Sequence, residues 1–428
     1  MHISYFICNF AAKLSKETIN RMNRVVITGM GICSCIGTSL DEVRDALYAG
    51  KSGIILDPVR KEAGFRSGLV GNVPKADLKA LLPRNTRSYM HEESQYAYLA
   101  TLQALQQAGI DMDYLERHEV GIIYGNDSAV EASNKAVDKF HQMHTSLACG
   151  SGSLFQALNS TISMNLACIF KLKGINQTIS AACSSGSQSI GMAATLIANG
   201  LQDCIICGGA EEVNHLGVVS FDGLQSFSVR EDAPEKASRP FDKDRDGLVP
   251  SGGGASLILE SYEHAIQRGA PILAEVLGWG FSGNGDHIST PNIEGPAKSM
   301  TNALKNAGVT PHDIGYVNAH ATSSLIGDQR EAQVIANVFG GYKVPVSSTK
   351  SLTGHEMWMA GASEVIYSIL MMKNDFMAGN LNFENPDEET AVVNVLPERK
   401  DQHFDLFLSN SFGFGGTNST LIIKNTRS

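Results

Sequence analysis

Residues 178–200 of the chain read TISAACSSGSQSIGMAATLIANG, in which a short strand-like run passes through a polar turn into a helix-like run. The same order of strand, polar turn, reactive side chain and helix returns at residues 346–370, which read VSSTKSLTGHEMWMAGASEVIYSIL. A strand that leads directly into a helix is the building unit of α/β proteins. Because this unit occurs twice, we predict an internally duplicated α/β chain that divides near residue 270.

The rest of the chain alternates in the same way. Apolar and β-branched runs predict strands at 25–28, 120–124, 204–207, 255–260, 274–281, 316–319 and 344–348. Amphipathic or alanine-rich runs predict helices at 40–47, 94–108, 187–199, 295–307 and 361–372. We therefore expect two similar halves, residues 22–270 and 271–428, preceded by an N-terminal extension over residues 1–21.

Composition narrows the class of protein. The chain has 428 residues, of which 43% are hydrophobic, and its net charge is −10. No segment approaches eighteen consecutive apolar residues, so we expect no membrane span. An acidic chain without a long basic run is a poor binder of nucleic acid. Eight cysteines are spread along the chain, most of them in apolar surroundings, which favours free thiols in a reducing cytoplasm.

Two short motifs imitate cofactor or metal sites. The glycines at 29–31 follow a strand, as in a dinucleotide-binding loop, but Ser34 stands where the third glycine should be. Cys204 and Cys207 have the spacing of zinc ligands, but no second pair lies nearby in the sequence. We interpret these two cysteines as small apolar side chains on a buried strand.

A third motif, DKDRDG at residues 242–247, imitates a calcium-binding loop. Its twelfth position is Gly253, where such a loop needs a glutamate with both oxygens on the metal. We therefore interpret the motif as a charged surface loop. The sequence predicts no metal site and no cofactor.

Three residues have settings that suit catalysis. Cys183 follows a strand and begins a helix, where free N–H groups and the helix dipole lower the pKa of a thiol. His320 and His355 each follow a strand at a polar turn, and the carboxyl edge of the sheet is where open α/β folds place their sites. Taken singly, Cys183 is better explained as a small buried residue at a tight turn, and each histidine as a core histidine with its hydrogen bonds satisfied. The glycine-rich turn at 410–418 could bring its backbone close to a ligand.

Together these motifs resemble those of the β-ketoacyl-[acyl-carrier-protein] synthases, in the usual order of that family. The similarity runs from about residue 22 to residue 424 and is slightly greater to synthase I than to synthase II. The motifs are SAACSS at 180–185, EKASRPFDKDRDG at 235–247, NAHATSS at 318–324 with GDQRE at 327–331, SSTKSLTGH at 347–355 and NSFGFGGTN at 410–418. The resemblance implies a duplicated thiolase-like fold with mixed sheets in α-β-α-β-α layers, a homodimer, and acyl carrier protein as partner.

The resemblance also implies roles for individual residues. Cys183 would accept an acyl chain as a thioester, and His320 and His355 would bind the malonyl thioester and stabilise the enolate left by decarboxylation. Backbone N–H groups of Cys183 and Phe414 would form the oxyanion hole, and the Phe414 side chain would act as a gate. Neutral imidazoles suit this role, because they donate hydrogen bonds where the enolate charge collects. The supporting residues would be Lys350, Glu364, Asp328 and Glu331, and the carrier-docking cations Arg60, Lys61 and Arg66.

The chain departs from the family pattern near both histidines. Ala321 follows the first histidine, where the family usually has glycine. After the second histidine, small residues of the family are replaced by EMWM at 356–359. Trp358 and Met359 are far larger than glycine or alanine, so they either shape the acyl pocket or fill core space against a neighbouring helix.

Several other classes of protein compete with this interpretation. A biosynthetic thiolase needs a second catalytic cysteine late in the chain, but the last cysteine is Cys207. Synthase III carries asparagine in place of one histidine, and a non-catalytic chain-length factor lacks the nucleophile. The pathway stays open between fatty acid elongation and a polyketide or polyene pathway, in which an inactive partner subunit could take part.

Overall fold

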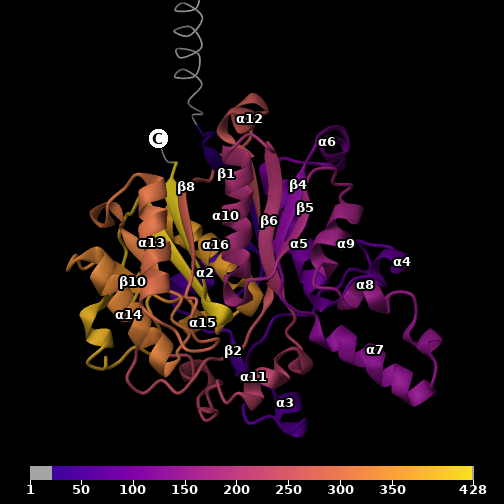
Figure 1. Cartoon of the computed structure of the whole chain (residues 1–428), viewed down its shortest axis with the longest axis horizontal. Helices are drawn as coiled ribbons and strands as arrows, with labels where there is room; N and C mark the ends of the chain where they lie inside the picture. The colour runs from indigo at the N-terminus through magenta and orange to yellow at the C-terminus, as the bar shows by residue number, and fades with distance from the viewer. Residues whose placement is uncertain (1–21, 427–428) are drawn as a thin grey trace, which may run out of the picture.

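Eleven strands form one mixed sheet in the computed structural model, which describes residues 22–426 (Figure 1). The predicted extension, residues 1–21, lies outside the described residues. Two further strands, β2 and β3, form a small hairpin. The strands are β1 Val25–Cys33, β2 Ile54–Leu56, β3 Leu69–Gly71, β4 Gly121–Gly125, β5 Asn176–Ile179, β6 Cys204–Glu211, β7 Gly253–Ser261, β8 Ala274–Gly283, β9 Tyr316–Asn318, β10 Pro345–Ser347, β11 Asn394–Val395, β12 Leu406–Gly413 and β13 Thr417–Asn425.

The order of the strands repeats, which confirms the predicted duplication. From the edge to the centre, the first half runs β5-β4-β6-β7-β1, and the second half runs β10-β9-β12-β13-β8 with β11 added outside β10. The directions repeat as well. In each half the three outer strands are parallel, and the two inner strands are antiparallel to their neighbours.

The two halves of the sheet meet along a very short seam. Strand β1 pairs with β8 at two positions, Val26 opposite Glu275 and Ile27 opposite Ala274. The predicted division after residue 270 falls in the loop between helix α12 and strand β8. The two sheets of the predicted layers are therefore continuous with each other at this seam.

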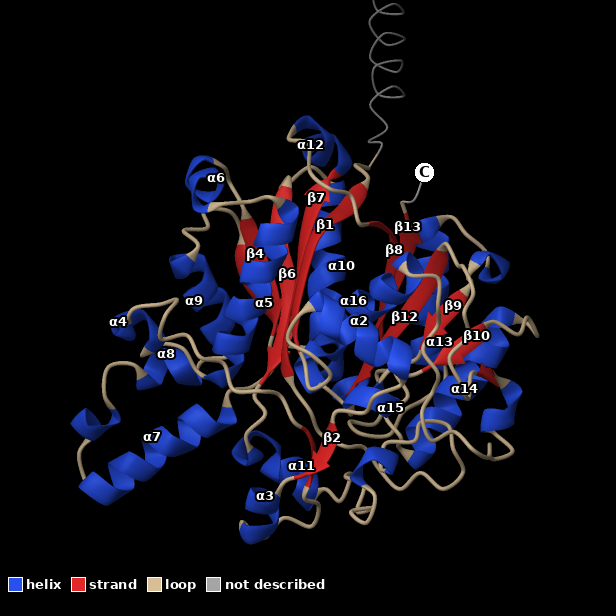
Figure 2. Ribbon diagram, turned by 180° about the vertical axis from the view of Figure 1, so that it is seen from behind, coloured by secondary structure: helices blue, strands red, loops and turns tan. Residues whose placement is uncertain are grey.

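Helices cover both faces of the sheet. Helix α5 packs on β1 and β7, α13 packs on β8 and β13, and α10 and α16 pack against each other in the middle layer (Figure 2). The helices are α2 Leu40–Ala49, α3 Pro58–Glu62, α4 Arg84–Arg87, α5 Glu92–Ala108, α6 Met112–Arg117, α7 Val130–Met143, α8 Ser153–Ala157, α9 Thr161–Ile169, α10 Ser185–Ala198, α11 Val219–Gly223, α12 Tyr262–Gln267, α13 Glu294–Ala307, α14 Leu325–Phe339, α15 Lys350–Thr353 and α16 Ala360–Lys373.

Small residues allow the two central helices to approach closely. A Cβ atom on Gly186 of α10 would lie 2.9 Å from the carbonyl oxygen of Trp358, and one on Gly361 of α16 would lie 2.5 Å from Cβ of Ser187. Side chains at these two positions would force the helices apart. In α16, residues 360–372 are all buried, so this helix is covered on every side.

The first strand is longer than predicted, and it includes two glycines on which a helix packs. Strand β1 continues past residue 28 to Cys33, and helix α5 lies directly on it. A Cβ on Gly29 would lie 2.1 Å from the carbonyl oxygen of Ala104, and one on Gly31 would lie 2.0 Å from that of Ala100. The glycines that imitate a dinucleotide loop therefore serve contact between the strand and the helix.

The interpretation of residues 242–247 as a charged surface loop is wrong for its key residues. Asp242 and Arg245 are buried. Asp242 accepts hydrogen bonds from Nε of Arg239 at 3.0 Å and from the backbone N–H groups of Glu384 and Asn385, both at 2.8 Å. The motif is therefore a buried ion-paired clamp that joins two loops. Among residues 22–426, no helix combines the length and the apolar character needed to cross a membrane.

Candidate active site

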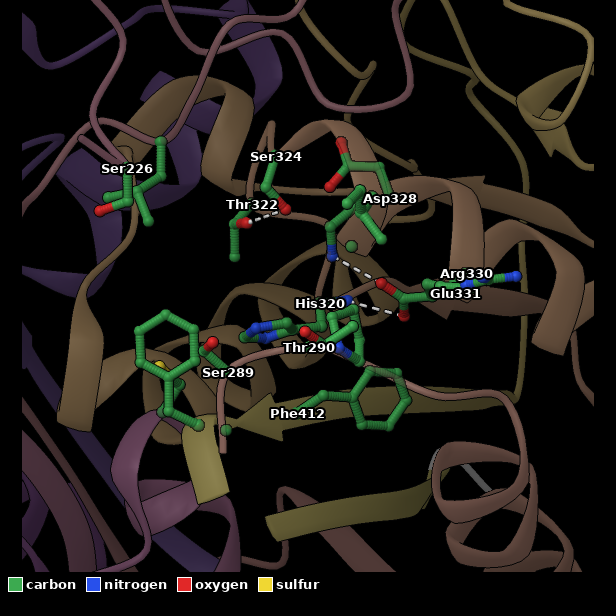
Figure 3. Close-up of a pocket in the computed structure, with 18 of the residues that line it drawn as sticks. Ser226, Ser289, Thr290, His320, Thr322, Ser324, Asp328, Arg330, Glu331 and Phe412 are labelled. Carbon is green, nitrogen blue, oxygen red and sulfur yellow. Dashed lines mark hydrogen bonds between the residues drawn. The ribbon is translucent and has the colours of Figure 1, made fainter. Parts of the chain in front are cut away.

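One pocket of about 600 Å³, part of which is drawn in Figure 3, brings together the predicted nucleophile and the two predicted histidines. Its lining includes Cys183 from the first half and His320, His355 and Phe414 from the second half. These four residues are separated by up to 231 positions in the chain, but they line the same pocket.

Each of these residues follows the carboxyl end of a strand of the sheet. Cys183 lies in a 3₁₀ turn between β5 and α10. His320 comes two residues after β9, and His355 follows the short helix α15 that comes after β10. Phe414 begins the turn between β12 and β13. The four positions are therefore set by the carboxyl ends of β5, β9, β10 and β12, as expected for a site in an α/β fold.

The turn that carries Cys183 is tied to the other half of the chain. Ser184 Oγ donates hydrogen bonds to the carbonyl oxygens of Ser411 and Thr417, both at 2.8 Å. Thr417 Oγ1 in turn donates to the carbonyl oxygen of Ala181 at 2.8 Å. These bonds fix the cysteine turn against β12 and β13, so the thiol is placed relative to the histidines of the second half.

The environment of the Cys183 thiol differs from the prediction. Burial raises the pKa of Cys183 to about 12, whereas the sequence predicted a lowered pKa at the helix start. The nearby Lys350 ammonium and the backbone N–H groups of Phe414 and of Cys183 itself act in the opposite direction and favour the thiolate. The thiol pKa rises because desolvation in the pocket outweighs the partial charge of the helix terminus. The same two N–H groups are those expected to form an oxyanion hole.

The two histidines form a pair. Their ring centroids lie 5.3 Å apart and the rings are nearly perpendicular, at 86°. The His320 backbone N–H donates to Oε1 of Glu331 at 2.9 Å, a contact drawn in Figure 3. The His355 N–H donates to the carbonyl oxygen of Val249 at 2.7 Å. Both backbones are therefore held without use of the ring nitrogens.

Both imidazoles are neutral at physiological pH. Burial, together with the positive charge of Lys350, lowers the pKa of His320 and of His355 well below the usual range. Among the described residues, Nδ1 of His320 and both ring nitrogens of His355 have no hydrogen-bond partner. The pair thus offers ring N–H groups to a ligand in the pocket.

The supporting charges surround the histidines in two groups. Lys350 and Glu364 form a buried ion pair beside the site. Glu331 accepts the N–H groups of His320 and, at 2.6 Å, of Ala321. Asp328 has a different place. Its carboxylate accepts the N–H of Phe241 at 2.9 Å and lies 3.7 Å from Nε of Arg245, so it anchors the buried clamp described above.

Aromatic side chains line the pocket, and the sequence did not single out two of them, Phe221 and Phe412. The Phe414 ring is 39% exposed and stacks on Phe221, with centroids 6.1 Å apart and planes at 16°. Phe412 packs against the His320 ring at 5.8 Å (Figure 3). Phe412 could have been found because it lies in the same glycine-rich turn motif, whereas Phe221 follows no motif.

The bulky residues after His355 are buried next to the cysteine. Residues Met357–Met359 form a 3₁₀ turn that leads into α16. Trp358 belongs to the same buried apolar cluster as Cys183, and its ring lies 6.3 Å from that of Phe221. Glu356 is buried as well and accepts hydrogen bonds from the hydroxyl groups of Ser34, Ser363 and Tyr367.

The prediction that Arg60 belongs to a carrier-docking surface is wrong. Arg60 is 1% exposed and donates from Nη2 to the carbonyl oxygen of Val213 at 3.0 Å, so it offers no charge to a partner at the surface. Lys61 and Arg66 are exposed, and Lys61 forms an ion pair with Glu231 at 3.1 Å. The sequence could not separate these three residues, because Arg60 is buried by contacts with a distant segment.

Comparison with known proteins identifies the family. The model of the N-terminal domain of β-ketoacyl synthases matches residues 22–265, and the model of the C-terminal domain matches residues 273–384. The chain belongs to the β-ketoacyl synthase family. It is 39% identical to 3-oxoacyl-[acyl-carrier-protein] synthase 1 of Haemophilus influenzae and to that of Escherichia coli strain K12, over 94% of the chain and 99% of each relative.

Solved structures of ketosynthases have the same fold. A β-ketoacyl synthase from Burkholderia phymatum superposes with a TM-score of 0.91 at 37% identity, over 95% of this chain and all of that one. A complex of a type II polyketide synthase acyl-carrier protein with its ketosynthase, bound to the hexaketide, gives a TM-score of 0.86 at 27% identity, again over 95% and 100% of the two chains. The thiolase-like fold expected from the sequence is therefore confirmed.

Proposed function

We propose that this chain is a 3-oxoacyl-[acyl-carrier-protein] synthase that elongates fatty acids by decarboxylative Claisen condensation. The observation that carries the proposal is the pocket that Cys183 lines together with two buried neutral imidazoles, His320 and His355. Membership of the β-ketoacyl synthase family supports the same reaction. The chemistry uses thioesters on the carrier and needs no further cofactor.

In the first half-reaction, Cys183 takes the acyl group. Its sulfur attacks the carbonyl carbon of an acyl thioester, the bond to the carrier sulfur breaks, and the carrier thiol leaves with the proton that the cysteine loses. The N–H groups of Cys183 and Phe414 stabilise the tetrahedral oxyanion, since both already act on the sulfur. A thiolate suits this step because it is both a good nucleophile and a good leaving group.

In the second half-reaction, the histidines act on the malonyl thioester. His320 and His355 donate hydrogen bonds to the thioester oxygen, where negative charge collects as carbon dioxide leaves. The resulting carbanion attacks the acyl carbonyl on Cys183, the carbon–sulfur bond breaks, and a 3-oxoacyl carrier product departs. Neutral rings are needed here, because a protonated imidazole would quench the carbanion.

An acyl carrier protein is the proposed partner, loaded with either the acyl or the malonyl group. Carrier proteins are acidic, and this chain is acidic too, so docking must use local cations. Lys61 and Arg66 are exposed and lie on one short segment, which supports them as part of that surface.

A cytoplasmic location is proposed from the cysteines. The seven cysteines of the described residues are all free thiols, which suits a reducing compartment.

We also propose a homodimer. Helix α7 projects from one side of the molecule (Figure 1). Large apolar side chains on α7, on α8 and on the turn between them are exposed. Strand β5 ends the main sheet on the same half and leaves one edge without a neighbouring strand among the described residues. Apolar surface of this extent is typical of a surface that binds another protein. The exposed residues on this arm are Val137, Phe140, Met143, Leu147, Leu154 and Phe155.

A ketosynthase of a polyketide or polyene pathway is the second candidate. The ishigamide ketosynthase/chain length factor is similar to this chain, with a TM-score of 0.88 at 28% identity. Trp358 shares a buried apolar cluster with Cys183, where the family has a small residue, which is the observation behind this alternative. The higher identity to the fatty acid synthases, 39%, favours elongation. A chain-length factor is less suitable, because Cys183 is present.

Replacement of Cys183 tests the proposed function. Cys183→Ala should abolish formation of 3-oxoacyl carrier product from acyl and malonyl carrier proteins, while the melting temperature stays close to that of the wild type. Cys207→Ala, which removes another buried thiol from strand β6, is the matched control and should keep full activity. Retention of condensation by Cys183→Ala would contradict the assignment of the nucleophile. Acyl carriers of several chain lengths, including polyene and polyketide starters, separate the two candidate pathways.

A further inference from the structure

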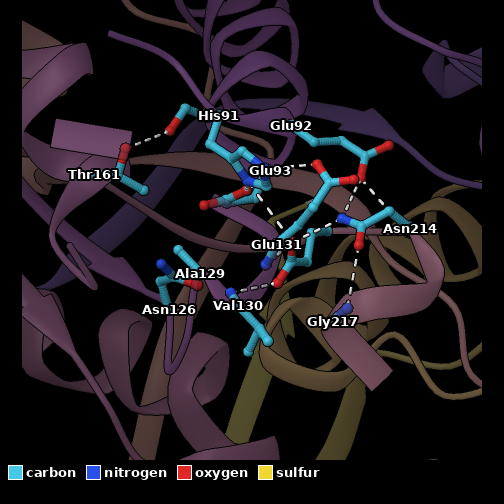
Figure 4. A network of polar contacts seen from close by, with 12 residues as sticks. His91, Glu92, Glu93, Asn126, Ala129, Val130, Glu131, Thr161, Asn214 and Gly217 are labelled. Atoms are coloured by element: carbon cyan, nitrogen blue, oxygen red, sulfur yellow. Dashed lines mark hydrogen bonds and ion pairs between the residues drawn. The ribbon is translucent and has the colours of Figure 1, made fainter. Parts of the chain in front are cut away.

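A cluster of carboxylates surrounds one histidine at the start of helix α5, outside the pocket (Figure 4). His91 caps this helix and is buried. Its Nδ1 lies 2.5 Å from Oε2 of Glu93 and 3.8 Å from Oε2 of Glu212, and its Nε2 lies 3.1 Å from Oε2 of Glu131. Three separate segments of the chain therefore bring carboxylate oxygens to a single imidazole.

Negative charge exceeds positive charge in this cluster. Glu93 and Glu212 are fully buried, and Glu131 is mostly buried. Apart from His91, one cation among residues 22–426 pairs with any of these carboxylates: Lys135, whose Nζ lies 2.8 Å from Glu131 at the exposed rim. Buried carboxylates in such excess are costly unless a cation or further donors compensate them.

A buried acceptor oxygen of the cluster itself has no donor among the described residues. Oε1 of Glu93 belongs to the carboxylate that contacts His91, and it makes no hydrogen bond. Glu93 is fully buried. Unsatisfied buried acceptors are rare in folded proteins, so this oxygen points to a missing positive group.

We propose that His91, through Nδ1, and Glu93 and Glu212 bind a divalent transition-metal cation of the Zn²⁺ type, while Glu131 accepts from the other ring nitrogen, Nε2, as an outer partner. The three ligand atoms lie within 4.8 Å of one another. A tetrahedral zinc site with bonds of about 2.0–2.2 Å places its ligand atoms about 3.3–3.6 Å apart, so small side-chain movements suffice. One imidazole and several carboxylates suit Zn²⁺ better than Mg²⁺, which prefers oxygen ligands alone and keeps its water.

The metal would join three elements that meet at this point. His91 and Glu93 belong to the start of α5, and Glu212 follows the end of β6. The Glu212 carboxylate also accepts the N–H groups of Val130 at 2.7 Å and of Glu131 at 3.3 Å, at the first turn of α7. Binding would therefore fix the base of the projecting helix α7 to the sheet. This inference is independent of the proposed condensation reaction.

Calorimetric titration of the chelator-treated protein with ZnCl₂, MnCl₂ and MgCl₂ tests the site. The wild type should bind one equivalent of Zn²⁺ and gain thermal stability, with weaker binding of Mn²⁺ and none of Mg²⁺. His91→Gln and the isosteric Glu93→Gln should each lower Zn²⁺ affinity by more than the ~10–100-fold that loss of an outer partner costs. The melting temperature without metal and the condensing activity show whether each variant folds.

A surface histidine provides the matched control. His403 lies between Asp375 and Asp405, at 2.8 Å and 3.0 Å, but is half exposed. His403→Gln should leave the Zn²⁺ affinity unchanged. The proposal is overturned if the wild type binds no Zn²⁺, if Glu93→Gln binds it as tightly as the wild type, if His403→Gln removes the binding, or if Mg²⁺ binds as tightly as Zn²⁺.

Discussion

Replacement of Trp358 by alanine tests whether the bulk beside Cys183 sets the length of the acyl chain. Trp358 is buried in the cluster that contains Cys183 and Phe221, but it is not among the residues that line the pocket. Truncation of a buried tryptophan costs about 3–5 kcal/mol in packing. The indole Nε1–H is buried without an acceptor among the described residues, so its removal regains about 1–3 kcal/mol. We expect a net loss of about 2 kcal/mol in the free energy of unfolding.

The cavity left by this change should open into the pocket next to Cys183. Longer acyl chains then fit, so the kcat/KM values for a series of acyl carrier proteins should shift toward longer substrates. Urea unfolding gives the stability, and Trp279→Ala on β8 is the matched control, expected to reduce stability with an unchanged acyl profile. A stability loss of about 5 kcal/mol with an unchanged profile for Trp358→Ala would refute a role in substrate choice.

Three further predictions concern the histidines and the carrier. His320→Ala and His355→Ala should each slow malonyl decarboxylation by about 10²–10³-fold, measured as carbon dioxide release, and slow acylation of Cys183 much less; equal losses would contradict the division of roles. The pKa of both histidines in the folded chain lies below the unfolded value of about 6.5, so the unfolded chain binds more protons. The free energy of unfolding therefore falls as the pH drops below 6.5, by up to about 1.4 kcal/mol per pH unit for each histidine. His355→Asn should show a smaller slope in urea unfolding between pH 6.5 and 5, and an equal slope would count against a neutral His355. Lys61→Glu with Arg66→Glu should raise KM for the carrier and weaken its salt dependence, while Lys305→Glu on α13 leaves KM unchanged.

Periodicity in the sequence predicted most of the elements that build the sheet, because strands and helices with a buried face carry their own pattern. It did not predict helix α7, whose residues 130–143 are mostly exposed and whose apolar side chains point to the surface instead of a core of this chain. It also did not predict that β1 and β8 join the two halves at residues 26–27 and 274–275. Pairing between strands so far apart in the chain depends on tertiary packing, which local patterns do not contain.

The candidate site was predictable where residue type and strand ends decide position. Cys183 and His355 each follow a strand, so their convergence follows from the topology of an α/β sheet. What could not be predicted is burial by distant segments. Burial turned the expected lowering of the Cys183 pKa into a rise and removed Arg60 from the surface. The cluster around His91 was hidden for the same reason, because its ligands come from segments near residues 91, 131 and 212.

The central position of helix α16 has a consequence for synthesis of the protein on the ribosome. Helix α10 is synthesised with the first half, whereas helix α16, which covers its inner face, is complete only at Lys373. At about 5–20 residues per second, the ~100 residues between position 270 and the end of α16 take about 5–20 s to make. During that interval the nascent chain presents an apolar helix face with no cover. A chaperone that binds nascent chains would find its target there, and the two halves become one cooperative unit when α16 is released.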